Sequence, residues 1–427
     1  MKIIIVHNQY QQPGGEDVVV RQEHELLEHA GHRVCLYQRS NSQINDFVGV
    51  KQLALIPNTI WSFNSRKEFA ELLKREKADL VHVHNTFMAI SPSIYSVCSE
   101  QGIPIVQTLH NFRLLCPAAN FFRDGIICKE CLEQSLLCSV RHGCYRNSRK
   151  ATAVVALMLA FHRALDTWRR SVARFIVLTE FAKQTFIAAG FPSERFVVKP
   201  NFVGSDPGER TGAGEYAAFI GRVEENKGVR VLLNGWKKLS TQYPLRIVGD
   251  GPERPALEAQ ACELGLSRIT FLGRLSPDAV IEVVKGARFI IVPSTLYEGF
   301  PMCIVESFAC GTPVLCSRLG GMIEIVQDHL TGLHFNPGDA QNLATTVEWA
   351  WNHPSEMVTM GRAARRKYER DYTADKNYSR LMEIYEQALA TYGSRRQLPW
   401  SDRLRTLSLP IATPPSARSA ETCAIPD

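Results

Sequence analysis

Two basic side chains, Arg222 and Lys227, stand five residues apart in the segment 221–228, which reads GRVEENKG. The segment follows a predicted buried strand and opens a predicted helix, the position where ligands of an open α/β sheet bind. Arginine offers a fork of hydrogen-bond donors and lysine a compact charge, so together they can hold a diphosphate. Plain solvated charges are the alternative interpretation, and the position between strand and helix favours an anion site.

Two carboxylates, Glu298 and Glu306, stand eight residues apart in the sequence EGFPMCIVE. Pro301 suits the first turn of a helix, which places Glu298 in the preceding loop and Glu306 on the second turn. Carboxylates accept hydrogen bonds from sugar and ribose hydroxyls, and amides at a helix N-terminus hold anions. Both could instead be surface acids, but the apolar neighbours of Glu306 argue against that interpretation.

Weaker signals come from a glycine pair and a histidine. Gly14 and Gly15 precede the first predicted helix without the full dinucleotide fingerprint, and they could form only a tight turn. His110 ends a predicted strand, so its side chain points toward the ligand crevice. Position alone does not single it out, because three other histidines also lie at strand ends: His7, His82 and His84.

Alternating strands and helices must position these motifs. In the first half, apolar runs typical of strands lie at residues 3–6, 33–37, 80–83, 105–109 and 175–178, with helical patterns between them. The same rhythm returns in the second half at residues 216–220, 245–248, 269–272, 289–292 and 313–316. This alternation is typical of parallel sheets that are covered on both faces.

The length of 427 residues exceeds what one hydrophobic core usually supports and predicts two domains. We predict a first α/β domain at residues 1–203, a linker rich in Gly and Pro at 204–214, and a second α/β domain at 215–371. A helical pattern follows at 372–392. The polar, proline-containing stretch 393–427 has the composition of a disordered tail.

The apolar start at residues 3–6 is too short for a signal peptide, and the longest apolar run elsewhere is 153–161. A spanning helix needs about 20 apolar residues, so we expect a cytoplasmic protein.

The formal net charge is +6, and the segment 141–174 alone holds eight basic residues against one acid, Asp166, or +7. This charge suits an anionic membrane surface, a pyrophosphate or nucleic acid, or else a solvated helix face. Next to the run 153–161 it predicts a peripheral site at the inner face of the membrane.

Five cysteines gather just past His110. Cys128 and Cys131 form a C-x-x-C pair, with Cys116 before them, Cys144 after them, and Cys138 between. Four thiolates, from Cys116, Cys128, Cys131 and Cys144, could enclose a structural zinc ion. Free or redox-active thiols are the alternative, since only one C-x-x-C unit is present.

These residues together resemble the retaining glycosyltransferases of family four, also called group-one glycosyltransferases. The cysteines are similar to those of a subset that is linked to bacterial surface polysaccharide synthesis. The matching segments are 14–16 (GGE), His110, 221–228, 248–252 (VGDGP), 298–306, 311–314 (GTPV) and 320–324 (GGMIE). They occur in family order over residues 1–390. The resemblance implies the GT-B fold, in which two Rossmann-like, doubly wound domains hold the donor in the cleft between them.

The resemblance also implies roles for individual residues. Arg222 and Lys227 would hold the donor diphosphate, with Gly14 and Gly15 closing over it. Glu298 would contact hydroxyls of the transferred sugar, and His110 would lie beside that sugar. Gly299, Phe300 and Pro301 would also belong to the donor-binding site. The ribose would bind Glu306. Catalysis would then depend on His110, Arg222, Lys227 and Glu298.

The implied activity is transfer of a hexose from a UDP- or GDP-sugar to a saccharide or lipid-linked acceptor, with retention of anomeric configuration. The sequence contains no Asp-x-Asp motif, so we expect no catalytic divalent metal. We also expect no nucleic-acid partner. Three alternatives stay open at this point: a sugar-nucleotide epimerase, a phosphorylase, and a metal-bearing nucleic-acid-binding protein suggested by the cysteines and the basic segment.

Overall fold

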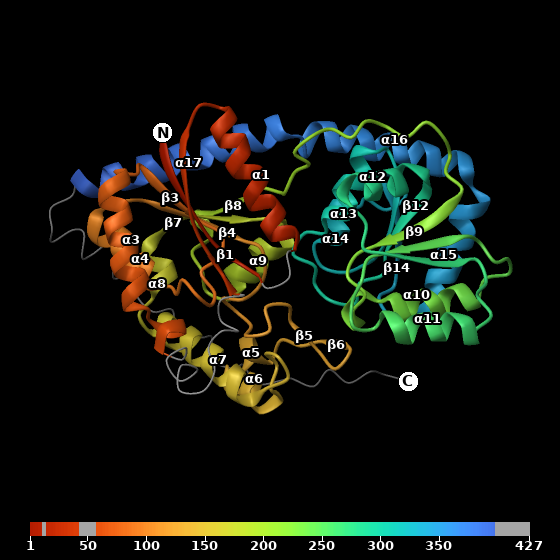
Figure 1. The fold of residues 1–427 in the computed structure, drawn as a ribbon, viewed down its shortest axis with the longest axis horizontal. Coiled ribbons are helices and arrows are strands. Elements are labelled where there is room, and N and C mark those ends of the chain that lie inside the picture. The colour runs from red at the N-terminus through yellow and green to blue at the C-terminus, as the bar shows by residue number, and fades with distance from the viewer. Residues whose placement is uncertain (11–13, 42–56, 398–427) are drawn as a thin grey trace, which may run out of the picture.

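The computed structural model describes residues 1–10, 14–41 and 57–397, and it contains two parallel six-stranded sheets, one in each half of the chain. Figure 1 shows the two halves side by side, each with helices packed around its sheet. Each half has the doubly wound α/β architecture, and the predicted fold class is confirmed.

The first sheet has the strand order β2-β1-β3-β4-β7-β8, with every neighbouring pair parallel. Its strands are β1 Lys2–Gln9, β2 Arg33–Ser40, β3 Leu80–Val83, β4 Ile105–Leu109, β7 Val172–Val177 and β8 Phe196–Val198. Its helices are α1 Gly15–His29, α3 Phe63–Glu76, α4 Ile94–Gln101, α7 Arg149–Ala164, α8 Thr167–Ser171 and α9 Glu180–Ala188. The strand order reverses between β1 and β3, and ligands bind beyond such a switch point.

Successive side chains of β1 belong to two hydrophobic cores, one on each face of the first sheet. Ile4 and Val6 pack with α3, α4, α7 and α9 on one face of the sheet. Ile3 and Ile5 pack on the opposite face with α1 and with the last helix, α17 (Ala374–Gln397). Because successive side chains of a strand point to opposite faces, one apolar run serves both layers.

The second sheet has the strand order β11-β10-β9-β12-β13-β14, again parallel throughout. Its strands are β9 Tyr216–Ile220, β10 Leu245–Val248, β11 Ile269–Gly273, β12 Ala287–Val292, β13 Val314–Ser317 and β14 Gly332–Phe335. Its helices are α10 Val229–Lys237, α11 Arg254–Glu263, α12 Pro277–Gly286, α13 Met302–Ala309, α14 Met322–Ile325, α15 Ala340–Asn352 and α16 Pro354–Asp371. The switch point here lies between β9 and β12.

The last helix returns to the first domain. Figure 1 shows α16 over the second domain and α17 extending across to the first. Leu381, Ile384 and Tyr385 of α17 are fully buried against the first sheet. The helix runs to Gln397, five residues beyond the end predicted from the sequence, and the rest of the predicted tail, 398–427, lies outside the described residues.

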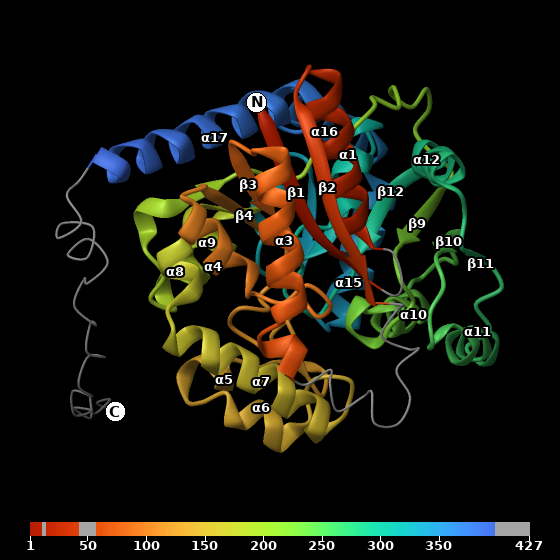
Figure 2. The ribbon, with the colours of Figure 1, turned by 60° about the vertical axis from the view of Figure 1, so that its left-hand side comes forward.

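The cysteine-containing segment forms a small lobe on the first domain. It contains β5 Phe122–Arg123, β6 Ile126–Ile127, α5 Glu130–Glu133 and α6 Leu137–His142. The lobe leads into α7, and Figure 2 shows α5, α6 and α7 grouped at the bottom of the first domain.

Candidate active site

Arg222 and Lys227 lie directly beyond the carboxyl end of β9, as the sequence predicts. Lys227 belongs to a single 3₁₀ turn, Glu225–Lys227, and Gly228 follows it in the left-handed region with φ +73°. A Cβ at Gly228 would lie 2.0 Å from the carbonyl oxygen of Pro293, just after β12. The turn can therefore pack against the end of β12 only because residue 228 has no side chain.

That packing brings Lys227 onto Glu298. The Lys227 Nζ lies 2.7 and 2.9 Å from the two carboxylate oxygens of Glu298, and Ser294 Oγ donates to the same carboxylate at 2.5 Å. Burial alone would lower the pKa of Lys227, but the Glu298 carboxylate outweighs it and raises the pKa. Lys227 is thus held as a cation at the switch point of the second sheet.

Arg222 is half exposed and its guanidinium pairs with Glu224 at 2.5 Å. It lines a cleft of about 830 Å³ at the carboxyl ends of β9, β10 and β11, together with residues 248–252 and Arg274. Glu306 lies on the second turn of α13, as predicted, and burial raises its pKa. Pro301 stands one residue earlier than expected, at the N-cap position of α13.

The glycine pair begins α1 and faces the second domain. The Gly14 N–H donates to Asp17 Oδ2 at 2.7 Å, and Asp17 Oδ1 lies 2.8 Å from His7 Nε2. A Cβ on Gly15 would lie 3.6 Å from Met302 Cγ of α13. The glycine loop therefore lies against the helix that carries Glu306.

His110 and Gly299 meet where the two domains face each other. A Cβ on Gly299 would lie 2.2 Å from the carbonyl oxygen of His110, so this close approach requires glycine. The His110 ring stacks on His84, with 2.9 Å between its Nε2 and Nδ1 of His84. Burial lowers the pKa of His110 well below its ordinary value, which leaves the ring neutral.

Two further contacts hold the domains together. The Glu324 carboxylate of α14 accepts backbone N–H bonds from Glu180 (2.7 Å) and Phe181 (2.5 Å) at the start of α9. A carboxylate at this place satisfies free helical N–H groups and complements the helix dipole. The Phe181 ring packs on Tyr297, with ring centroids 4.7 Å apart.

Sequence reasoning did not single out Glu16 as a buried acid. Burial raises its pKa to about 8, and Tyr10 OH donates to Glu16 Oε2 at 3.1 Å. The position next to the two glycines was visible in the sequence, but the burial that makes this acid unusual depends on tertiary packing.

Two sets of side chains have the chemistry of metal ligands. A hydrogen bond with Cys131 lowers the pKa of Cys116 to about 6. Burial, together with the charges of Cys116 and Cys128, raises the pKa of Cys144. The four thiols therefore share one neighbourhood, while Cys138 Sγ donates to Gln134 Oε1 at 3.4 Å. Among the described residues, the set whose ligand atoms all lie within 4.8 Å of one another is instead Glu23, His82 and His84.

Comparison with known proteins places this geometry in a family. The model of Glycosyltransferase Family 4 matches residues 13–206, and that of glycosyl transferases group 1 matches residues 208–367. The two models together span most of the chain, and the protein belongs to the group 1 glycosyltransferases. The family predicted from the motifs is confirmed.

Relatives with known names are transferases of various sugars. The chain is 32% identical to D-rhamnosyltransferase WbpZ of Pseudomonas aeruginosa over 36% of this chain and 41% of that protein. It is 26% identical to 2-deoxystreptamine glucosyltransferase of Streptomyces kanamyceticus over 77% of this chain and 80% of that protein. It is 28% identical to O-antigen chain mannosyltransferase C of Escherichia coli over 40% of this chain and 46% of that protein. The matched region is thus under half the length of WbpZ and of the mannosyltransferase.

Solved structures share the fold. Anabaena HepE in complex with UDP superposes with a TM-score of 0.65 at 18% identity, covering 90% of this chain and all of that one. Sucrose-phosphate synthase of Thermosynechococcus elongatus superposes with a TM-score of 0.66 at 18% identity, covering 91% of this chain and 99% of that one. At this level of identity the likeness concerns the fold alone.

Proposed function

We propose that this chain is a retaining glycosyltransferase that moves a hexose from a nucleoside-diphosphate sugar to a saccharide or lipid-linked acceptor of surface polysaccharide synthesis. The observation that carries the proposal is the contact of Lys227 with Glu298 directly beside Gly299, whose backbone lies against the His110 carbonyl of the first domain. The complex of HepE with UDP and the names of the relatives support a nucleotide-sugar donor.

The geometry suits stabilisation of a departing diphosphate. A lysine ammonium has three N–H donors, and two of them point to Glu298, which leaves one for a phosphate oxygen. The Glu298 carboxylate keeps acceptor capacity for a sugar hydroxyl while it holds Lys227. Arg222 adds a second cation at the rim of the 830 Å³ cleft. Positive charges fixed where negative charge develops lower the barrier to bond breaking.

The proposed acceptor side belongs to the first domain. A pocket of about 640 Å³ opens between the cysteine lobe, α8 and α9. Phe181 and Lys129 line it, and both also contact Tyr297 of the second domain. Its remaining walls mix apolar side chains such as Leu132 and Trp168 with charged ones, a lining that suits an amphipathic acceptor.

The test of the proposed function is release of free nucleoside diphosphate that depends on an acceptor. Lys227→Ala and Arg222→Ala should each lower turnover roughly 100-fold or more, because each removes a charge-assisted phosphate contact. Lys237→Ala, an exposed lysine on α10, is the control and should be unaffected. Full activity of either site variant would remove the diphosphate role. Release without acceptor would indicate hydrolysis of the donor, and no release with acceptor would favour an epimerase.

The two glutamates should separate in binding of the bare nucleotide. We expect Glu306→Ala to weaken binding about 10-fold or more through loss of the ribose contact. Glu298→Ala should spare nucleotide binding and impair only transfer, because it frees Lys227 for phosphate. Calorimetric titration of both variants with the best ligand among UDP, GDP and ADP measures this. The reverse pattern would exchange the two roles.

We also propose that Cys116, Cys128, Cys131 and Cys144 bind a structural zinc ion. Cys116 and Cys131 are hydrogen-bonded to each other, Cys128 and Cys144 lie in the same neighbourhood, and four cysteines are a ligand set that structural zinc sites use. Metal analysis of the purified chain should find about one zinc, which Cys128→Ser loses. Cys138→Ser, whose thiol bonds to Gln134 instead, should keep it. A wild-type chain without zinc after growth in zinc-supplemented medium would contradict the proposal.

A further proposal concerns an anionic membrane surface. No helix in the described part of the chain is both long and apolar enough to span a bilayer. On α7, however, Leu157 and Phe161 are exposed by 55% and 39%, and Leu165 just beyond it by 46%. They recur every four residues, so they form one stripe, and exposed Arg149 and Lys150 begin the same helix.

Some basic residues of the segment 141–174 are not available at the surface in the structure. Arg163 points inward and donates to the carbonyl oxygens of Leu114 and Leu115. Arg174 lies under α17 beside Gln387, and Trp168 is buried at 3% exposure. The docking surface we propose is therefore the α7 stripe with Arg141, Arg149 and Lys150.

Sedimentation with anionic and neutral vesicles tests this surface. Changing Arg141, Arg149 and Lys150 to Ser should weaken binding to anionic vesicles roughly 100-fold, at about 1 kcal/mol for each charge. The control changes three exposed basic residues of the second domain to Ser: Lys237, Lys238 and Arg268. Equal binding to both lipid types, or equal losses in both triple variants, would exclude this surface.

A further inference from the structure

A buried ion pair lies in the first domain beneath His110. Lys199, directly after β8, and Glu23 of α1 are each only 1% exposed, and Lys199 Nζ lies 2.6 Å from Glu23 Oε1. Taking two charges out of water is expensive, and an apolar pair of similar size would often be as stable. The burial of the charged Lys199 and Glu23 therefore indicates a role beyond packing.

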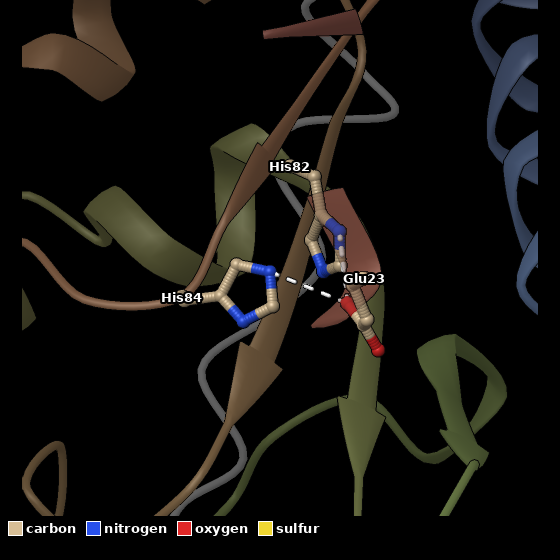
Figure 3. A group of neighbouring side chains, drawn as sticks. All are labelled: Glu23, His82 and His84. Carbon is tan, nitrogen blue, oxygen red and sulfur yellow. Dashed lines mark ion pairs between the residues drawn. The ribbon is translucent and has the colours of Figure 1, made fainter. Parts of the chain in front are cut away.

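The ion pair connects to His110 through one histidine. Glu23 Oε2 lies 3.4 Å from His84 Nε2, and Figure 3 shows this carboxylate facing the His84 ring. On the other side of the ring, His84 Nδ1 lies 2.9 Å from His110 Nε2. Lys199, Glu23, His84 and His110 thus form a chain of two hydrogen-bonded pairs that are joined by the electrostatic contact of Glu23 with His84, and the chain ends at the candidate active site.

The partners fix which nitrogen of each ring carries hydrogen. Burial lowers the pKa of His84 and of His110 well below its ordinary value, so each neutral ring has one N–H. Glu23 Oε2 and His84 Nε2 are both buried and have no hydrogen-bond partner among the described residues, and they lie 3.4 Å apart. A carboxylate oxygen at this distance favours hydrogen on His84 Nε2 over a lone pair there, and Nδ1 then becomes the acceptor. His110 must then donate from Nε2, which leaves Nδ1 as its remaining polar atom.

We propose that the Lys199–Glu23 pair acts through His84 to hold His110 in its Nε2–H tautomer, so that His110 Nδ1 accepts a hydroxyl of the transferred sugar. Glu23, His84 and Lys199 are positioning residues in this scheme. The functional part rests on the proposed glycosyl transfer, whereas the tautomer does not. A site that only accepts at this point selects a donor sugar with a free hydroxyl there over its deoxy analogue.

A metal ion on Glu23, His82 and His84 is the competing explanation, since their ligand atoms lie within 4.8 Å of one another. Both ring nitrogens of His82 already have partners at 2.8 Å, Tyr385 OH and Thr108 Oγ1. Lys199 occupies the second oxygen of Glu23, and a metal cation would lie close to its ammonium group. These contacts favour the chain from Lys199 to His110 over a metal site.

Histidine-selective ¹⁵N labelling of the full chain tests the proposal, because two-bond ¹H–¹⁵N correlation spectra distinguish the tautomers of each ring. The His110 signal is assigned by its loss in His110→Asn. We expect Nε2–H for His110 in the wild type. An Nδ1–H signal for His110 would overturn the proposal whether or not the chain transfers sugar, and this measurement needs no variant at His84.

Two substitutions at His84 form a matched pair. Asparagine places an amide oxygen near the position of Nδ1 and keeps an acceptor for His110, whereas glutamine reaches only the position of Nε2. His84→Gln should therefore give a mixture of His110 tautomers and lower kcat roughly 10-fold with little change in KM for the donor. His84→Asn should preserve the tautomer and rescue kcat.

A third variant serves as a control for stability. His162 is a buried histidine outside the chain, bonded to Thr167 and to the carbonyl of Ile60, so His162→Gln should leave the His110 signal unchanged. An unaltered His110 tautomer in His84→Gln would overturn the proposal. So would a metal ion that copurifies with the wild type and is lost in Glu23→Gln. Absence of transfer by the wild type would count against the proposed function alone.

Discussion

The close approach of Gly299 to the His110 carbonyl is the constraint on which the site depends. Each parallel sheet presents its ligand-binding loops at one edge, and one ligand can use both sets only if those edges face each other at a fixed spacing. The 2.2 Å that would separate a Cβ at residue 299 from this oxygen leaves room for glycine alone. Two nearby contacts keep the same spacing between the domains: the Glu324 carboxylate accepts N–H bonds from the start of α9, and Tyr297 packs on Phe181.

The two sides of the site are assembled in different ways. On the donor side, Lys227 and Glu298 belong to loops that follow the neighbouring strands β9 and β12, so sheet topology alone brings them together. The environment of His110 instead draws on α1, β3 and the chain after β8. This side depends on the tertiary packing of the whole first domain, to which α17 contributes through Tyr385.

This difference explains how much could be predicted from the sequence. Strands buried on both faces are recognisable as apolar runs, and Arg222, Lys227, Glu298 and Glu306 could be found because each motif fits within nine residues. The edge strand β8 escaped prediction because it is only three residues long, and β14 escaped because Gly332 and His334 interrupt its apolar pattern. The pair of Glu23 and Lys199 spans 176 positions, and the lone lysine after the apolar run 196–198 was its only local sign.

The separation also bears on how catalysis would be organised. The charges that we propose for stabilising a leaving diphosphate are in the second domain, whereas the chain that we propose for orienting His110 lies entirely within the first. In this scheme the tautomer of His110 is set before a donor binds, and it needs no rearrangement during the reaction. Fixed dipoles and charges of this kind are what makes a site complementary to a transition state in advance. On this view the unfavourable free energy of burying Glu23 and Lys199 is offset during folding. In return, His110 Nδ1 is already oriented as an acceptor when the sugar binds.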